Sequence, residues 1–230
     1  MRCSKNIKAV AHGASLKDAF FIPPHQNEVL ELMSDLEKFL HNDELPIPHL
    51  IRIGIAHYQF ETIHPFLDGN GRVGRLLITL YLVSNKVINK PALYLSDFFE
   101  KNRQLYYDNL TAVRTKNQMI QWLTFFLVGV METAQNSIDT FNAIILLRQD
   151  VEDKKIIQLG KRVPIAMELI KYLYSKPILR ANEIASTLEI NISTAHRLIQ
   201  DFERLGILKE QTGYKRNRIF VFEYYLNLFK

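Results

Sequence analysis

Apolar residues recur at intervals of three and four along most of the first 150 residues, which is the spacing of one face of an α-helix. The clearest stripe, in residues 27–42, consists of Val29, Leu32, Met33, Leu36, Phe39 and Leu40. Asn27 is the expected N-cap of this helix, and Pro46 interrupts the pattern after it. The spacing therefore predicts a helix that begins near Asn27.

Two more helices flank a proline and a pair of glycines. One is expected from His49 to Thr62, because the residue before Pro65 avoids helical backbone. Another follows Gly71, with an apolar stripe made of Val73, Leu76, Leu77, Leu80 and Tyr81. The segment between the two helices is therefore expected to be a tight loop.

The helical pattern continues to about residue 150. Ser96 can cap a helix that runs through about Val113, and a long helix is expected from Asn117. No alternation of strands and helices and no internal repeat interrupts this part of the chain. A mainly α fold is therefore predicted for residues 1–155.

The last 71 residues have a different pattern. Three amphipathic segments, AMELIKYLYS, NEIASTLEI and NISTAHRLIQDFERLG, precede two alternating ones, ILKEQ and RIFVF, which flank TGYKRN. The third segment is expected to begin with Asn191 or Ser193 as its cap and to end at Gly206. Three helices followed by a β-hairpin are typical of a small winged helix-turn-helix domain, expected at residues 160–230. The stretch before it, DVEDKKIIQLGKRVP, can end a helix or form a linker.

The charge is divided unevenly between these two parts. Residues 1–159 carry 17 Lys and Arg against 17 Asp and Glu, whereas residues 160–230 carry 12 against 7, so the whole net charge of +5 lies in the second part. A basic excess of this kind indicates a domain that meets nucleic acid.

The composition places the chain in the cytoplasm. Cys3 is the only cysteine, so no intramolecular disulfide can form. The first residues, MRCSKNIKAVAHGA, lack the apolar region of a secretory signal. The densest apolar run covers residues 122–131, about half of the roughly 20 residues that cross a membrane. We therefore expect a cytoplasmic protein without a membrane partner.

The candidate chemistry lies in HPFLDGNGRVGR, residues 64–75. A helix that begins at the glycines offers free N–H groups to an anion, and arginines three residues apart on its first turn can reach further phosphate oxygens. Asp68 is a hard oxygen ligand suited to Mg²⁺, and His64 can take a proton from an attacking hydroxyl. The stretch thus holds the groups needed for attack on a nucleotide phosphate.

A structural reading of the same residues is a turn followed by a helix cap, since a lone histidine is more often structural than catalytic. The density of base, acid, glycines and arginines favours the site. No GxxxxGK[ST] loop occurs in the sequence.

HPFLDGNGRVGR resembles the HPFx[D/E]GNGRxxR motif of Fic-domain proteins, the bacterial AMP-transferases, at every fixed position. FFIPPH, HYQFETIHPF and LYLSDFFEKNRQLYYDNL resemble the flap, the approach to the motif and the nucleotide-side segment of that family. A C-terminal winged helix is also a known attachment to it. The likeness covers about residues 1–150.

The resemblance implies a transfer of AMP from ATP to a Ser, Thr or Tyr hydroxyl of a target protein, which could be the chain itself, with Mg²⁺ as cofactor and pyrophosphate as leaving group. His64 would be the base and Asp68 the Mg²⁺ ligand. The nucleotide would contact Gly69, Asn70, Gly71, Arg72 and Arg75, with Tyr106 or Tyr107 beside the adenine. A flap at Phe20, Phe21, Ile22 and Pro23 would bind the target as an added strand.

Alternatives remain within the family. The kinase-like Doc branch has lysine where this chain has Gly71, which favours AMP transfer over phosphate transfer here, and a phosphocholine-transferring relative would need another nucleotide pocket. The family's inhibitory helix, [S/T]xxxE[G/N], has no match; SDFFEK at residues 96–101 differs at the last place. We therefore expect a version without the N-terminal inhibitory portion, not inhibited in cis, and open to dimer formation or to a separate inhibitor protein.

The C-terminal domain has two readings. Outward positions that can meet DNA are Thr194, His196, Arg197, Gln200 and Arg204, with Lys215, Arg216 and Arg218 on the wing. Asp201 and Glu203 on the same helix would repel DNA, and winged helices also dock proteins. The alternative to an enzyme is accordingly a DNA-binding regulator whose Fic-like domain senses a nucleotide or is inactive.

Overall fold

The computed structural model describes residues 21–91, 93–214 and 216–229. It divides into two compact units, Met1–Ser137 and Ile138–Lys230. The limits predicted from the sequence, 1–155 and 160–230, place the boundary later and stay predictions. No helix in the described ranges is both long and apolar enough to span a membrane.

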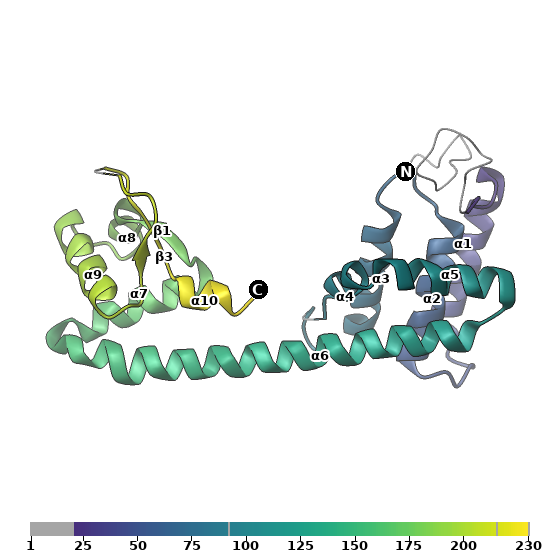
Figure 1. Ribbon diagram of the computed structural model, residues 1–230, viewed down its shortest axis with the longest axis horizontal. Coiled ribbons are helices and arrows are strands. Elements are labelled where there is room, and N and C mark those ends of the chain that lie inside the picture. Colours follow the sequence, from purple (N-terminus) through teal and green to yellow (C-terminus); the bar gives the residue numbers. More distant parts are fainter. Residues whose placement is uncertain (1–20, 92, 215, 230) are drawn as a thin grey trace. The chain divides into compact units, whose positions relative to one another are not determined.

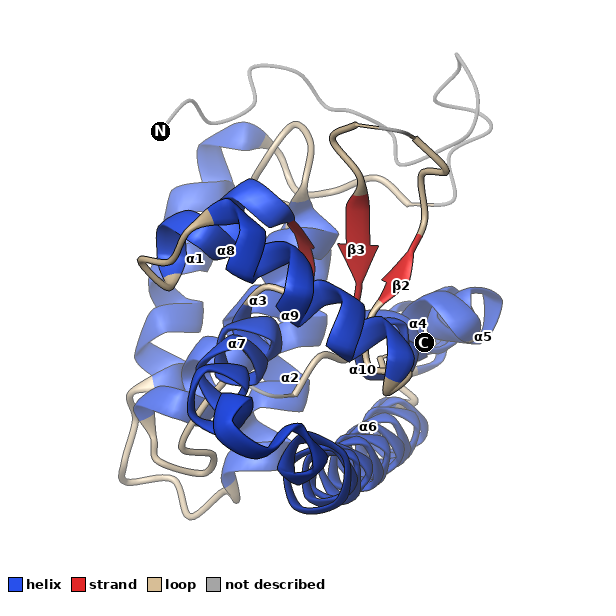
Figure 2. Cartoon of the chain, turned by 90° about the vertical axis from the view of Figure 1, so that its left-hand side faces the viewer, coloured by secondary structure: helices blue, strands red, loops and turns tan. Residues whose placement is uncertain are grey.

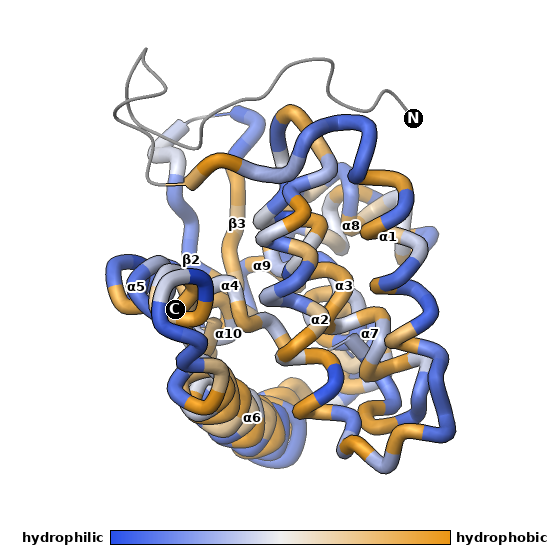
Figure 3. The backbone as a smooth tube through the Cα atoms, turned by 90° about the vertical axis from the view of Figure 1, so that its right-hand side faces the viewer, coloured by the Kyte–Doolittle hydropathy of each residue, from blue (hydrophilic) through white to orange (hydrophobic). Residues whose placement is uncertain are grey.

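The first unit is helical, as predicted, with the bounds of its elements labelled in Figure 1. The helices are α1 (Gln26–Leu40), α2 (His49–Ile63), α3 (Asn70–Ser84), α4 (Ser96–Lys101), α5 (Arg103–Lys116) and α6 (Met119–Gln149). Along these helices, orange apolar segments alternate with blue polar ones in Figure 3, as the helical spacing requires.

The core of the first unit forms where α2 packs against α3 and α6. Trp122 of α6 is fully buried, and its indole N–H donates to the carbonyl of Gly54 at 2.9 Å. Ile53, Phe126 and Leu82 pack in the same apolar cluster. This packing fixes α2, at whose end His64 lies.

A buried arginine closes the turn between α1 and α2. Arg52 is 5% exposed and donates to the carbonyls of Phe39, Asn42 and Leu45 at 2.8, 2.5 and 2.7 Å. The cation therefore satisfies carbonyls that the end of α1 and the following turn leave free. Pro46 lies in that turn, as expected.

Two predicted helix starts were wrong. The N-cap of α1 is His25, whose ring accepts a hydrogen bond from the backbone N–H of Asn27. Ser96 is the first residue of α4 rather than its cap, and the single helix predicted to Val113 breaks at Asn102 into α4 and α5. Helix propensity does not distinguish between neighbouring residues as the start of a helix, because tertiary packing decides where the helix begins.

The second unit begins within α6 and continues through a π-helical turn (Asp150–Lys155) and a 3-10 stretch (Ile156–Arg162). The remaining elements are α7 (Val163–Ser175), β1 (Ile178–Arg180), α8 (Ala181–Thr187), α9 (Ile192–Arg204), β2 (Lys209–Glu210), β3 (Ile219–Val221) and α10 (Glu223–Asn227). Helical backbone thus continues after Gln149 until Gly160, whose φ of 56° and ψ of −119° kink the chain before α7. Val151, Ile156 and Leu159 are buried in this unit's core.

The sheet is antiparallel, in the order β1-β3-β2, beside α8 and α9 (Figure 2). Register pairs Leu179 with Phe220 and Lys209 with Val221. The hairpin was predicted, whereas β1 and α10 were not, because three and five residues are too few to carry a period. Asn191 caps α9, accepting from the Thr194 N–H at 2.8 Å, and Gly206 follows it at φ 65°, both as expected.

Candidate active site and nucleic-acid interface

A pocket of about 360 Å³ lies over the N-terminus of α3. His64, Arg75 and residues 67–72 line it, so the structure brings most of the motif to one place. From α4 and α5 come Phe99, Glu100, Arg103, Tyr106 and Tyr107. The pocket therefore has a motif wall and a wall formed by the following two helices.

His64 occupies an unusual backbone position. It is the C-cap of α2 with φ 51° and ψ 56°, the left-handed conformation that often ends helices but seldom with histidine. The ring is half-buried, and this burial lowers its pKa below 6.5, while a hydrogen bond to the Glu61 backbone opposes the shift and Arg114 adds to it. The imidazole is therefore neutral near pH 7, the form that can accept a proton.

The loop after His64 is closed by one side chain. Asn70 is 2% exposed; its Oδ1 accepts from the N–H of Phe66 at 2.8 Å and its Nδ2 donates to the Phe66 carbonyl at 2.7 Å. Phe66 is partly buried and packs against the core. The Asn70 side chain thus holds the loop, and what this residue offers to the pocket is its backbone.

The first turn of α3 presents free amides. Gly69 precedes the helix at φ 83°, a conformation that L side chains rarely adopt, and its carbonyl accepts from Val73 N–H at 3.0 Å. In the described part of the chain, no side chain caps this end. The N–H groups of Asn70, Gly71 and Arg72 therefore remain available to an anion.

The two motif arginines differ in their partners. Arg72 is exposed, with Nη2 at 3.6 Å from Oδ2 of Asp68. Arg75 is half-buried, and its Nε donates to the Ser96 hydroxyl at 3.1 Å, which leaves both Nη groups uncommitted by that bond. Two guanidinium groups therefore border the pocket from successive turns of α3.

Beneath the motif, α2 and α3 approach each other closely at Gly74. A Cβ at that position would lie 2.6 Å from Oε1 of Glu61 and 3.2 Å from Cε1 of His57. Both side chains are buried. Glycine is therefore required here by space, whereas at Gly69 it is favoured by backbone conformation.

His57 and Tyr106 form a buried pair under the second wall. Nε2 of His57 lies 3.0 Å from the Tyr106 hydroxyl, so its hydrogen-bond partner is on α5 rather than within its own helix. Burial lowers the pKa of His57 to about 4 and raises that of Tyr106 well above 10. Tyr106 is thus buried at the base of the pocket wall, and the half-exposed Tyr107 packs edge-on against it.

Asp68 is the one motif acid in the pocket lining. Its side chain is 93% exposed, and among the described residues no group of three or more His, Cys, Asp or Glu could hold a metal ion. A single carboxylate beside an anion site nevertheless suits Mg²⁺, which commonly takes one or two carboxylates and completes its shell with substrate phosphates and water. Asp68 is therefore compatible with that ion.

Sequence reasoning missed Leu67, Phe99 and two charged pocket residues, Glu100 and Arg103. The two charged residues come from either side of the break between α4 and α5 and form an ion pair of 3.7 Å. Their spacing resembles that of any exposed helical pair, so only the break at Asn102 could have indicated a turn toward the motif.

Of the predicted flap, Phe21, Ile22 and Pro23 are described, and Phe20 lies outside the described residues. The Phe21 ring lies 3.7 Å from the guanidinium carbon of Arg114 on α5. This contact is a cation–π interaction that ties the start of the described chain to the first unit.

In the second unit, α9 has the predicted sides. Ala195, Leu198, Ile199 and Phe202 are buried, Leu205 is half-buried, and His196 and Arg197 are exposed beside half-exposed Thr194. Asp201 was placed wrongly: it is 7% exposed and pairs inward with Arg162 and with Arg204 at 3.3 Å. It therefore does not face a DNA strand.

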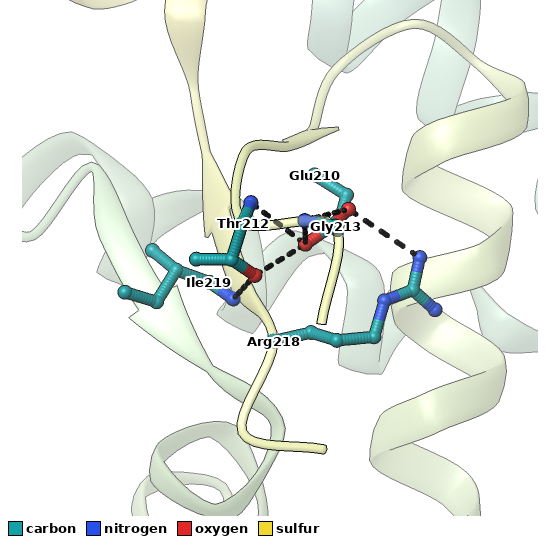
Figure 4. A network of polar contacts seen from close by, with 5 residues as sticks. All are labelled: Glu210, Thr212, Gly213, Arg218 and Ile219. Carbon is teal, nitrogen blue, oxygen red and sulfur yellow. Dashed lines mark hydrogen bonds and ion pairs between the residues drawn. The ribbon is translucent and has the colours of Figure 1, made fainter. Parts of the chain in front are cut away.

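The wing is held by an acid (Figure 4). Glu210 accepts from the N–H and hydroxyl of Thr212 at 2.9 and 2.5 Å and from the Gly213 N–H at 3.0 Å. It also lies 3.9 Å from Arg218. Arg216 is exposed, and Lys215 lies outside the described residues. Of the predicted wing cations, Arg218 thus has an internal partner.

Comparison with known protein families finds one match in each unit, in agreement with the two kinds of domain expected from the sequence. Residues 5–82 match the Fic/DOC family, and residues 163–212 match the IclR helix-turn-helix domain. The chain therefore carries a Fic/DOC family domain followed by an IclR-type helix-turn-helix domain.

Two curated relatives are named protein adenylyltransferases. A probable enzyme of Aquifex aeolicus is 42% identical over 31% of this chain and 22% of its own, and one of Caenorhabditis elegans is 43% identical over 27% and 13%. The chain thus spans less than a quarter of either relative. The crystal structure of a Fic family protein from Desulfovibrio desulfuricans matches with a TM-score of 0.50 at 22% identity, covering 87% of this chain and 57% of that one, a likeness of fold.

Proposed function

We propose that the first unit is a protein adenylyltransferase, which moves AMP from ATP to a Ser, Thr or Tyr hydroxyl of a target protein. The observation that carries this proposal is one pocket lined by a half-buried histidine, the open N-terminus of α3 and two arginines. Homology to protein adenylyltransferases over part of the chain supports it.

In the proposed reaction, the neutral His64 takes the proton of the target hydroxyl as its oxygen attacks the α-phosphorus of ATP. A new P–O bond forms to the target, the bond between the α-phosphorus and the bridging oxygen breaks, and pyrophosphate leaves. Burial keeps the pKa of His64 below 6.5, so the imidazole does not need to lose a proton first.

The rest of the motif would bind the triphosphate. The free amides at the start of α3 and the guanidinium groups of Arg72 and Arg75 would stabilise the charge that passes to the leaving group. Asp68 would hold Mg²⁺, which when bound neutralises phosphate charge. Arg72, now 3.6 Å from Asp68, would exchange that weak exposed pair for phosphate oxygens.

The second wall would receive the nucleoside. Tyr107, half-exposed and packed on Tyr106, can lie against a base, while Tyr106 supports it from within. The described flap residues, Phe21, Ile22 and Pro23, lie at the beginning of the described chain. They would bind an extended target segment as an added strand.

For the second unit, we propose DNA binding through α9 and the wing. The exposed His196 and Arg197, with Thr194, would face the major groove, and Arg216 with Lys215 would contact phosphates. The pairing of Asp201 with Arg162 and Arg204 supports this reading, because it neutralises one of the two acids on α9 that would repel DNA. A regulator with an inactive Fic-like domain would bind DNA and transfer nothing.

The test uses ATP labelled in either the α- or the γ-phosphate, with Mg²⁺ and a cell extract. AMP transfer predicts protein labelling from the α-label that is lost in the His64→Ala variant, with labelling from the γ-label the same for both proteins. Labelling from the γ-phosphate that is lost in His64→Ala would show phosphate transfer instead. If neither label is transferred, while the wild type and the His64→Ala variant both bind DNA, the chain would act as a DNA-binding regulator.

A further inference from the structure

A buried acid that the proposed reaction does not use lies beneath the motif. Glu61 of α2 is 8% exposed, and within the described residues its Oε1 has no hydrogen-bond partner. Unpaired buried carboxylate oxygens are costly, so such a group calls for a specific role. Its contact with Gly74 places it against the turn of α3 that carries Arg75.

The carboxyl group of Glu61 and the guanidinium of Arg75 both approach Gly71. A Cβ built on Gly71 would lie 3.1 Å from Nη1 of Arg75 and 3.8 Å from Oε1 of Glu61. Gly71 lines the phosphate pocket. The guanidinium of Arg75 therefore lies near the buried carboxyl group, without an ion pair of 4.0 Å or less between them, and the hydroxyl of Ser96 accepts from its Nε.

The charges around Glu61 come from three helices. Arg75 on α3 and Arg114 on α5 favour its ionised form, but burial is the larger effect and raises its pKa from 4.5 to about 7. Tyr106 on α5 and His57 on α2 face the same region, and both stay neutral near pH 7 because burial shifts each pKa away from it. Near neutral pH the carboxyl group is thus partly ionised beside two arginines.

We propose that Glu61 is a positioning residue for Arg75: its carboxylate and the Ser96 hydroxyl together hold the guanidinium with its Nη groups toward the phosphate pocket. This inference rests on the proposed use of ATP. A free arginine side chain loses much rotamer freedom when it grips a phosphate, so an arginine that is already oriented binds more tightly.

An opposite effect competes with this one. A carboxylate near a phosphate also repels it, so its removal could strengthen binding. Because Arg75 lies near Glu61 and carries the opposite charge, we expect the orientation of the Arg75 side chain to outweigh the repulsion of the phosphate. Loss of the charge should therefore weaken nucleotide binding, and only where Arg75 is present.

The test measures KM for ATP, kcat of AMP transfer and direct ATP affinity in the full chain. Glu61→Gln keeps the shape of the side chain and should raise KM and the dissociation constant roughly five- to tenfold, with kcat changed less than about twofold. Combined with Arg75→Ala, it should change them by less than about twofold, since a residue that acts through another is not additive with it. Thr62→Ala, one residue along α2, is the matched control and should change neither.

The pH profile separates positioning from a merely structural role. A carboxyl group with a pKa of about 7 is ionised above that pH. The ratio of KM for Glu61→Gln to KM for wild type should therefore be largest at pH 8 and approach one near pH 6, where protonated Glu61 resembles glutamine. Titration of ATP and of His64 affects both proteins and cancels in the ratio.

Several results would overturn the inference alone: unchanged or tighter ATP binding by Glu61→Gln, additive effects with Arg75→Ala, or a ratio that does not change with pH. If Glu61→Gln does not fold, Ser96→Ala carries the same test and should raise KM roughly threefold only with Arg75 present. A wild-type chain that does not bind ATP would instead overturn the proposed function and this inference with it.

Discussion

The motif loop of the first unit and the wing of the second use charge in opposite ways. In the loop, Arg72 and Arg75 border a pocket, and the acid near Arg72 is exposed and 3.6 Å away. In the wing, the carboxylate of Glu210 accepts hydrogen bonds from the amides of the turn and lies 3.9 Å from Arg218. The electrically balanced unit thus offers cations to a ligand, while the basic unit uses part of its excess internally.

The same holds elsewhere in the second unit. Its internal ion pairs include Arg162–Asp201, Arg204–Asp201, Lys176–Glu183, Lys209–Glu223 and Arg218–Glu210. Net charge along a sequence therefore indicates a class of partner, but which cations face that partner depends on where the acids fold. The predictions below test this difference, from the largest effect to the smallest.

The largest effect is expected for His64→Ala. If the pocket cations serve a reaction, loss of the base should reduce AMP transfer about 10²–10⁴-fold, while DNA affinity stays unchanged. Label transfer and DNA binding are measured on the same preparation. Equal labelling by the variant and the wild type would remove His64 from the reaction.

A large change in stability is expected for Gly74→Ala. The added methyl group would lie 2.6 Å from Oε1 of Glu61 and 3.1 Å from Cδ1 of Phe60, so α2 and α3 must separate. Overpacking of this kind costs about 1–3 kcal/mol in the free energy of unfolding, measured by denaturant titration of the first unit.

The matched control for Gly74→Ala is Gly213→Ala in the wing. Nothing lies within 4 Å of a Cβ there, but φ is +64°, so the strain is conformational, about 1 kcal/mol, and confined to the second unit. A first unit that unfolds at the same denaturant concentration in Gly74→Ala and wild type would contradict the close approach of α2 to α3.

The sequence predicted the loop well because its chemistry is local. Pro65 ends one helix, the glycines begin the next, and both are decided by the backbone of a few residues. The cap at Asn191 and the stop at Gly206 were predicted for the same reason. Positions of this kind depend little on the rest of the fold.

The buried acids could not be predicted. Glu61 and Asp201 belong to residue types that are rarely buried, yet they are only 8% and 7% exposed. His25 as a cap and the break at Asn102 likewise depend on packing rather than on propensity. Burial of a charge is a property of tertiary contacts, and a single sequence carries no direct signal of it.

A moderate effect is expected when DNA binding is compared between Arg197→Ala and Arg218→Ala. Arg197 is exposed on α9, so its loss should weaken duplex binding roughly three- to tenfold and lower the slope of log affinity against log salt by about one. Arg218 lies 3.9 Å from Glu210 and over the Phe220 ring, so its loss should change affinity less than about twofold. Equal losses would show that the wing pair opens on DNA, and no binding by the wild type would favour protein docking.

The smallest and most local effect is expected at Glu210. Glu210→Ala removes the acceptor of the Thr212 and Gly213 amides, so their hydrogen exchange should accelerate about tenfold while α9 amides are unchanged; Glu168→Ala, an exposed acid on α7, is the control.

The Thr212 hydroxyl, followed by the turn amides and Arg218, lowers the pKa of Glu210 below 4.5. A depressed carboxyl pKa means that the contribution is present above 4.5 and is lost as pH falls through the lowered value, so protection of these amides should persist to pH 4.5 in the wild type and fade below it. Protection that does not depend on pH in that range would show that the hairpin backbone alone holds the wing, and that Glu210 does not determine which cations the second unit offers to DNA.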